Sequence, residues 1–375
     1  MDLVKSIAVF LGTVIGVGIF SLPFVAMKAG FFVAVIYLLI MALVSYKIHD
    51  FYAEIALSTE GKHRLPGYAE KYLGRNWKIF SFIVIAVSFV CALLAYLIVG
   101  GQFLFNALSP YLGGSSIIYF FIFFISGAFL IFREIKAISK MELALLVIIL
   151  LILILILIAA LPHINNLNLL TFDNNYLFFP YGAIVFSLWG ASIIPELKEM
   201  ALRRNKQKAR NILKKTIFWG IIISSLAYLI FIFSVLGVSG NITSDEAISG
   251  LKGFLGLGIV QIGFILGFLC CFTSYITIGL TLKKSLQYDF NVSGFFSWTV
   301  TAFAPLFFYF LGAREFIKII GFAGTVTIGL EALLIILIYR VLLKAKISMS
   351  GKIISYILAA MFGLGILLEI FYFLL

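Results

Sequence analysis

Long apolar runs, separated by short polar stretches, fill almost the whole chain. A helix needs about 20 residues to cross a hydrocarbon layer of about 30 Å, and eleven runs approach or exceed this length. We therefore expect an all-α polytopic membrane protein with eleven transmembrane helices. The runs are Val4–Met27, Phe31–Leu57, Ile79–Leu108, Ser116–Phe132, Leu143–Leu161, Leu177–Leu197, Thr216–Leu236, Gly253–Leu282, Gly294–Leu311, Phe316–Leu343 and Ile353–Leu374.

The composition agrees with this pattern. Of the 375 residues, 63% are hydrophobic and only 12% are charged, which is more apolar surface than a soluble domain of this size can bury. No linker or shift in composition divides the chain, so we expect one transmembrane domain over residues 1–375. The first run is full length, and we predict that it is retained rather than cleaved as a signal peptide. Cys91, Cys270 and Cys271 lie inside apolar runs, so we expect neither a disulfide nor a metal site.

The distribution of basic residues predicts the orientation. If the N-terminus is cytoplasmic, 24 of the 28 Lys and Arg residues fall on the cytoplasmic side. This asymmetry follows the positive-inside rule. We therefore expect a multi-pass protein of the cell membrane with a cytoplasmic N-terminus and an extracellular C-terminus. The basic run LRRNKQKARNILKK then faces lipid headgroups, and the charge calls for no nucleic-acid partner.

Two of the runs carry helix breakers near their middle. The first contains GVGIFSLP and the sixth contains SLWGASIIPELKE, and in a helix Gly costs about 1 kcal/mol and Pro about 3 kcal/mol relative to Ala. The first and sixth runs, which carry the two breaks, are five runs apart. Because five is an odd number, the second unit is inverted across the membrane relative to the first. We therefore expect two inverted repeats, over about 4–161 and 177–343, with 353–374 as an extra helix. Paired broken segments are typical of a transporter binding site, although glycine also serves close packing in membrane helices.

A broken helix exposes backbone groups that a ligand can satisfy. The amides of Gly16, Val17, Gly18 and Ile19 suit a carboxylate, and the carbonyls near Phe186–Leu188 suit an ammonium group. Together they match the head group of a zwitterionic amino acid. The candidate substrate-binding residues are Thr13, Gly16, Val17, Gly18, Ile19, Ala92, Tyr96, Phe186, Ser187, Leu188, Trp189, Gly190 and Tyr275.

The eighth run contains a group of oxygen ligands. Cys270, Thr273 and Ser274 follow i, i+3, i+4 spacing, which places one backbone carbonyl and two hydroxyls on one helical face. An alkali cation prefers such ligands. The alternative is that both hydroxyls bond back to carbonyls of their own helix.

Glu331 is the carboxylate set most deeply in an apolar run, TVTIGLEALLIIL. An ionisable residue at this depth indicates function, and Glu331 could carry a coupling proton. The alternative is that Glu331 pairs with a basic residue such as Arg340. His49, His63 and His163 have no partners at metal-ligand spacing, and we assign them no role.

Four ordered motifs resemble a known family. GTVIGVGIFSLPFVAMKAG, PGYAEKYLG, TSYITIGLTLKKSLQYDF and APLFFYFLGAREFIKIIGFAG are together similar to the aromatic and hydroxy amino acid permeases of the amino acid/polyamine/organocation superfamily. The resemblance implies a LeuT-type fold of five plus five inverted repeats and alternating access. By analogy with sodium-coupled relatives, carbonyls of Gly12 and Ile15 would bind Na⁺ together with Cys270, Thr273 and Ser274. The bacterial aromatic permeases are instead generally regarded as proton symporters.

These features predict a secondary symporter of a neutral amino acid, coupled to Na⁺ or H⁺, and the resemblance includes aromatic amino acids among its candidate substrates. Besides Na⁺ as a coupling ion we expect no cofactor, and besides the amino acid and membrane lipids no obligate partner. The alternative is a non-transporting amino acid sensor like the nutrient receptors of spore germination. We expect no enzyme, because the chain lacks a nucleotide loop, a Ser/His/Asp set and a metal cluster.

Overall fold

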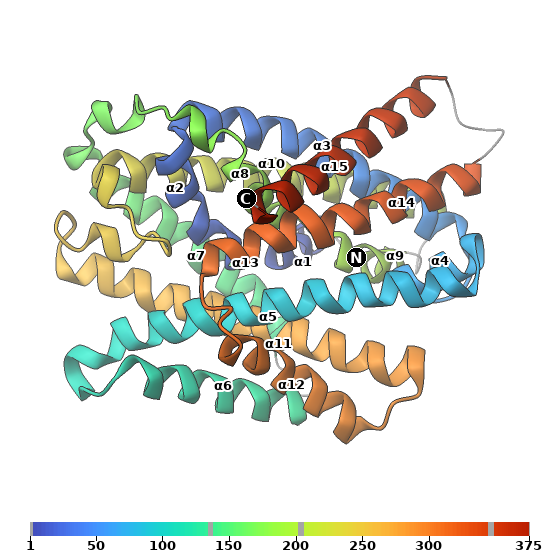
Figure 1. The fold of residues 1–375 in the computed structure, drawn as a ribbon, viewed down its shortest axis with the longest axis horizontal. Helices are drawn as coiled ribbons and strands as arrows, with labels where there is room; N and C mark the ends of the chain where they lie inside the picture. The colour runs from blue at the N-terminus through green and yellow to red at the C-terminus, as the bar shows by residue number, and fades with distance from the viewer. Residues whose placement is uncertain (1–2, 134–137, 202–205, 344–348, 375) are drawn as a thin grey trace.

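The computed structural model describes residues 3–133, 138–201, 206–343 and 349–374, and within these residues it is helical without strands. Figure 1 shows most helices lying along one long axis of the molecule. The α-helices are α1 (Leu3–Val14), α2 (Gly18–Ala29), α3 (Phe31–Ser58), α4 (Leu65–Leu73), α5 (Arg75–Leu112), α6 (Ser116–Phe132), α7 (Ile138–Ala160), α8 (Phe179–Ser187), α9 (Ile194–Ala201), α10 (Lys206–Ser239), α11 (Leu257–Phe290), α12 (Gly294–Phe310), α13 (Phe316–Phe322), α14 (Ile328–Leu343) and α15 (Met349–Leu374).

Short turns of other helix types connect these elements. The 3₁₀ turns are η1 (Leu161–His163), η2 (Asn166–Leu169), η3 (Asn174–Tyr176), η4 (Ala191–Ile193), η5 (Gly240–Ile242) and η6 (Ser249–Leu251). A π-helical turn, η7 (Ala323–Thr327), joins α13 to α14. Turns of this rare type are frequent at functional sites.

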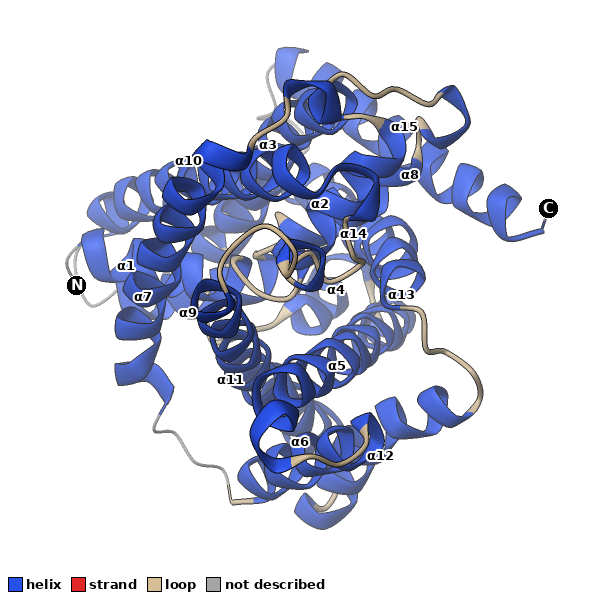
Figure 2. Cartoon of the chain, turned by 90° about the vertical axis from the view of Figure 1, so that its left-hand side faces the viewer, coloured by secondary structure: helices blue, strands red, loops and turns tan. Residues whose placement is uncertain are grey.

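The helices account for the eleven predicted runs. In the described part of the chain, seven helices are long and apolar enough to cross a membrane, and the bent pair α1–α2 forms one further span. The helices α6 and α12 are apolar but shorter, at 17 residues each. The short helices α8 and α9 lie on either side of the break in the sixth predicted run, and we call this pair the interrupted span. Figure 2, which looks along the long axis, shows α6 and α12 together at one edge and α15 at another.

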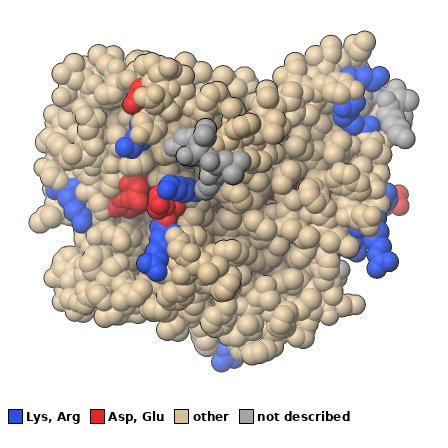
Figure 3. Space-filling model, viewed as in Figure 1, with Lys and Arg blue, Asp and Glu red and all other residues tan. Residues whose placement is uncertain are grey.

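The surface fits a lipid environment. Large apolar side chains of the outer helices are exposed, such as Leu43 on α3 and Ile125 on α6. On the face shown in Figure 3 the charged side chains are sparse and most of the surface is uncharged. The protein is therefore a multi-pass membrane protein. Part of the predicted lipid-facing basic run, residues 202–205, lies outside the described residues.

The predicted break in the first run is confirmed. α1 ends at Val14, α2 begins at Gly18, and the two helices are bent by 57°. The amide of Gly16 donates to the carbonyl of Val14, at 3.0 Å, instead of continuing the helical ladder. Glycine is required here by close approach, because a Cβ on Gly16 would lie 2.7 Å from the hydroxyl oxygen of Tyr96. A Cβ on Gly18 would likewise meet Ser187 of α8.

The sixth run is interrupted where its breakers predicted. α8 ends at Ser187, Leu188–Gly190 are not α-helical, and the chain continues through η4 into α9. α2 packs against α8, so the two breaks lie close together. The hydroxyl of Tyr228, on α10, lies 2.9 Å from the carbonyl oxygen of Val14 and 2.7 Å from that of Ser187. The buried hydroxyl of Tyr228 is therefore within hydrogen-bond distance of one carbonyl at each break.

Candidate functional site

A central cavity lies where the two breaks meet α5, α11 and α14. It encloses about 60 Å³. Many of the residues predicted from the sequence line it, together with the carboxylate of Glu331 and six residues that the sequence did not single out. The predicted residues are Thr13, Gly16, Gly18, Ala92, Tyr96, Phe186, Ser187 and Trp189, and the additional ones are Val14, Ser88, Phe89, Ser192, Ile278 and Ile328.

Other predicted residues lie elsewhere. Ile15, Ile19 and Cys270 line a second, apolar cavity that also includes Phe20 and Phe231. The ring of Tyr275 packs against Phe123 of α6, with centroids 5.5 Å apart, and is not among the side chains that line the central cavity. The placement of Tyr275 was not predictable, because it depends on how α11 is rotated against its neighbours.

Three backbone positions from the prediction are buried near the breaks. Val17 and Leu188 are fully buried. The amide of Gly190 and the carbonyl of Leu188 already have partners on α3, described below. Gly12 lies in the last turn of α1, one turn before the break.

The predicted sodium ligands are held in different ways. The hydroxyl of Thr273 donates to the carbonyl of Leu269, at 2.9 Å, and lies 3.3 Å from that of Cys270. This is the back-bonding alternative that the sequence left open. Ser274 faces the hydroxyl of Tyr96, which also lies beside the backbone of Val17. The sodium site remains a prediction.

Glu331 is tied to the second break. Its side chain is buried, with 6% of its surface exposed, and its Oε2 accepts a 2.9 Å hydrogen bond from the indole Nε1 of Trp189. Arg340, the basic partner that the alternative proposed, instead lies over the ring of Tyr356 on α15, with its guanidinium 3.9 Å from the ring centroid. Within the described residues no Lys or Arg forms an ion pair with Glu331.

Two side chains of α3 hold the backbone at the second break. The amide of Gly190 donates to Nε2 of His49, at 2.9 Å, and the hydroxyl of Ser45 donates to the carbonyl of Leu188, at 2.9 Å. We predicted no role for His49 from the sequence, but its imidazole is a hydrogen-bond partner of the second break. The four-residue spacing of Ser45 and His49 on one helix face was the only signal for it.

Four phenylalanine rings cover the first turn of α2. Phe20 lies 4.8 Å from Phe103 and 5.9 Å from Phe231, measured between ring centroids, and Phe103 lies 6.2 Å from Phe264. These rings come from α2, α5, α10 and α11. They form an apolar layer on the side of the central cavity toward which α2 runs.

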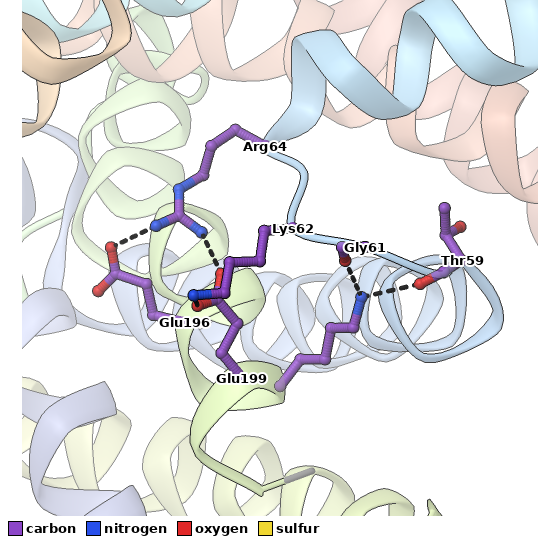
Figure 4. Close-up of polar contacts among 7 residues, drawn as sticks. Thr59, Gly61, Lys62, Arg64, Glu196 and Glu199 are labelled. Atoms are coloured by element: carbon purple, nitrogen blue, oxygen red, sulfur yellow. Dashed lines mark hydrogen bonds and ion pairs between the residues drawn. The ribbon is translucent and has the colours of Figure 1, made fainter. Parts of the chain in front are cut away.

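Ion pairs link two segments at the opposite end of the molecule. Figure 4 shows the segment that follows α3 reaching across to α9. Arg64 lies 2.9 Å from Glu196 and 3.6 Å from Glu199, and Lys62 lies 3.4 Å from Glu199. We call these four side chains the polar latch.

Lys198 and Arg210 add further links at this end. Nζ of Lys198 donates to the carbonyls of Thr59 and Gly61, at 2.8 and 2.9 Å (Figure 4). Arg210 of α10 pairs with Glu54 of α3 at 2.8 Å. The helix α4, which follows Arg64, packs on α5 and α14. The polar latch therefore connects α9 to the segment that leads into this group of helices.

Two solved structures have a similar overall fold. MhsT in complex with L-phenylalanine aligns with a TM-score of 0.69 at 15% identity, covering 99% of this chain and 98% of that one. Mhp1, a nucleobase-cation-symport-1 family transporter in a closed conformation with bromovinylhydantoin bound, aligns with a TM-score of 0.68 at 11% identity, covering 92% and 79%. These likenesses confirm the predicted LeuT-type fold.

Curated relatives match over most of their length. The chain is 27% identical over 338 residues to the tyrosine-specific transport system 1 of Haemophilus influenzae, covering 84% of this chain and 81% of that protein. It is 23% identical over 345 residues to glutamine transporter 2 of Aliivibrio fischeri, covering 89% and 87%. A sequence model of the tryptophan/tyrosine permease family matches residues 1–338. The chain belongs to the tryptophan/tyrosine permease family.

Proposed function

We propose that this protein is a secondary transporter that imports a neutral amino acid together with a proton, and that Glu331 carries the proton. The observation that carries the proposal is the position of Glu331. It is the one acidic residue among the described residues that line the central cavity, and it contacts the second break through Trp189. A change at Glu331 therefore reaches both the cavity and the interrupted span.

The first break supplies the partners for the substrate's head group. The amide of Gly16 already donates to the carbonyl of Val14, but the amides of Gly18 and Ile19 open α2 and carry the positive end of its helix dipole, which suits a carboxylate. At the second break the amide of Gly190 and the carbonyl of Leu188 are bonded to α3. We therefore propose that the substrate carboxylate binds at the first break.

The other residues that line the cavity suit a substrate side chain with an apolar body and a polar end. Phe89, Phe186 and Ile278 provide apolar surface, and Ser88 and Ser192 provide hydroxyls. The relatives' names mention tyrosine and glutamine, and both amino acids have this character. L-Tyrosine and L-glutamine are therefore the first substrates to test.

The hydrogen bonds of Thr273 and the burial of Glu331 favour proton coupling over sodium coupling. The hydroxyl of Thr273 is directed to carbonyls of its own helix, whereas Glu331 is buried in the cavity wall without an ion-pair partner among the described residues. An ionisable side chain at such a depth in a membrane-spanning helix is typical of a proton pathway.

Uptake into proteoliposomes tests the proposal. With an inward proton gradient in sodium-free buffer, we expect accumulation of labelled L-tyrosine or L-glutamine. Glu331→Gln should abolish gradient-driven accumulation and retain exchange of substrate across the membrane, while Thr273→Ala and Ser274→Ala should leave accumulation unchanged. Accumulation that requires Na⁺ and is lost in Thr273→Ala would overturn proton coupling. Binding without accumulation would instead support the sensor alternative.

We propose a single transmembrane domain in the cell membrane, built from the inverted repeats 4–161 and 177–343 and the extra helix 353–374. The N-terminus is cytoplasmic, so the polar latch lies at the cytoplasmic end. We propose no enzymatic reaction, no cofactor apart from the coupling ion, and no partner apart from the amino acid and lipids.

A further inference from the structure

His49 is a fully buried imidazole at the centre of the molecule. It lies on α3 with none of its surface exposed. Its ring packs edge-on against Phe10 of α1, with centroids 5.6 Å apart, and lies 5.3 Å from Trp189. His49 does not line the central cavity, so a direct contact with substrate does not explain it.

The hydrogen bonds of His49 define its protonation state. The backbone N–H of Gly190 donates to Nε2 of His49. Because Nε2 accepts this hydrogen bond, it carries no hydrogen of its own. The hydrogen is then on Nδ1, which donates to the carbonyl of Ser45 one turn earlier on α3. The imidazole is therefore the neutral Nδ1–H tautomer, fixed from both sides.

Together, Ser45 and His49 hold the backbone on either side of Trp189. Ser45 donates to the carbonyl of Leu188, and His49 accepts from the amide of Gly190. The residue between these two anchors is the one whose indole reaches Glu331. The chain here is not α-helical, and the amide of Gly190 has no backbone acceptor among the described residues, so the bond to His49 satisfies a group that a continuous helix would otherwise pair.

We propose that His49 is a positioning residue, which clamps the amide of Gly190 and thereby orients the indole of Trp189 toward Glu331. The His49 ring has one acceptor and one donor at opposite edges, which an apolar residue of the same size lacks. The consequence for coupling rests on the proposed role of Glu331. The clamp itself does not depend on transport.

Two amide substitutions separate the clamp from packing. In His49→Gln the side-chain oxygen can take the place of Nε2 and accept from Gly190. In His49→Asn the shorter amide ends near the position of Nδ1 and cannot reach Gly190. Ile48→Val, at a fully buried neighbour on α3, is the matched control for disturbed packing.

Fluorescence of Trp189 reports the clamp without transport. In a protein whose only tryptophan is Trp189, with Trp77, Trp219 and Trp298 replaced by Phe, the emission and anisotropy should be unchanged in His49→Gln and Ile48→Val. In His49→Asn the emission maximum should shift and the anisotropy should fall. Equal spectra for the Gln and Asn variants would overturn the proposal. Unfolding of His49→Asn with a stable His49→Gln would support it, since only the reach to Gly190 differs.

A comparison in two backgrounds tests the link to Glu331. We expect His49→Asn to slow gradient-driven uptake by about tenfold, as for one lost hydrogen bond of about 1.4 kcal/mol. In the Glu331→Gln background it should change exchange much less, because the group it acts on is already gone. An equal factor in both backgrounds would show a packing role only. If neither the parent nor the Glu331→Gln protein transports, the proposed function fails. The fluorescence of Trp189 still tests the clamp in that case.

Discussion

The indole nitrogen of Trp189 lies 2.9 Å from a carboxylate oxygen of Glu331, and this bond joins residues 142 positions apart. Trp189 lies in the break of the interrupted α8–α9 span, whereas Glu331 is on α14, one turn after the π-helical turn η7. The bond therefore connects the part of the fold where backbone is unwound to the acidic residue of the cavity.

Trp189→Phe should impair transport more than any other single loss of a tryptophan. The substitution keeps an aromatic ring and removes the donor to a buried carboxylate, at a cost of about 1–3 kcal/mol, so we expect uptake to fall by about tenfold or more. Initial rates in proteoliposomes measure this. Trp219→Phe, at a residue that is 46% exposed, is the control, and equal rates for the two variants would contradict the prediction.

Tyr228→Phe should destabilise the protein. Its hydroxyl serves the carbonyls of Val14 and Ser187, and both are left without this partner in the interior. We expect a loss of about 1–3 kcal/mol of unfolding free energy. Thermal unfolding in detergent should show a lower midpoint, whereas Tyr111→Phe, at an exposed side chain, should match the parent. An unchanged midpoint for Tyr228→Phe would show that other groups satisfy these carbonyls.

Gly16→Ala should abolish substrate binding, and Tyr96→Phe should restore part of it. The added Cβ would lie 2.7 Å from the hydroxyl oxygen of Tyr96 and 3.6 Å from the nearest ring carbons, so removing that oxygen relieves the clash. Binding of labelled L-tyrosine and L-glutamine checks this. Gly363→Ala, where a Cβ meets nothing within 4 Å, is the control. Failure of Tyr96→Phe to improve Gly16→Ala would place the defect in the backbone instead.

Neutralising the polar latch should open the end of the molecule where α9 ends. Partly exposed ion pairs contribute about 0–1 kcal/mol each, so we expect a small effect of Glu196→Gln alone and a larger one when Glu199→Gln is added. A cysteine at Ser192, in a protein without native cysteines, should then react faster with a thiol reagent applied from that side.

The control for the latch is an ion pair elsewhere. Glu315→Gln removes the exposed pair with Lys318 and should leave labelling at position 192 unchanged. High salt should imitate neutralisation of the latch, because salt screens exposed charges. Labelling rates that do not respond to Glu199→Gln or to salt would show that the latch does not control access.

Features set by local propensity and segment length could be predicted. Apolar runs of membrane length predicted the helices, because a buried backbone in lipid must satisfy its own hydrogen bonds. Gly16 and Gly18 predicted the first break, which appears between Val14 and Gly18. Most predicted cavity residues near these breaks, such as Thr13 and Trp189, line the cavity.

The partners of the breaks were decided by tertiary structure. Tyr228 is 214 residues from Val14, and His49 is 141 residues from Gly190, so no local pattern links them. The same is true of Tyr275, whose ring turns toward α6 because of the rotation of α11. Local sequence alone determined which segments cross the membrane and where two of them break, since both features depend on neighbouring residues. Only the packing of helices decided which side chains satisfy the freed backbone groups, because those contacts require segments far apart in the chain to meet.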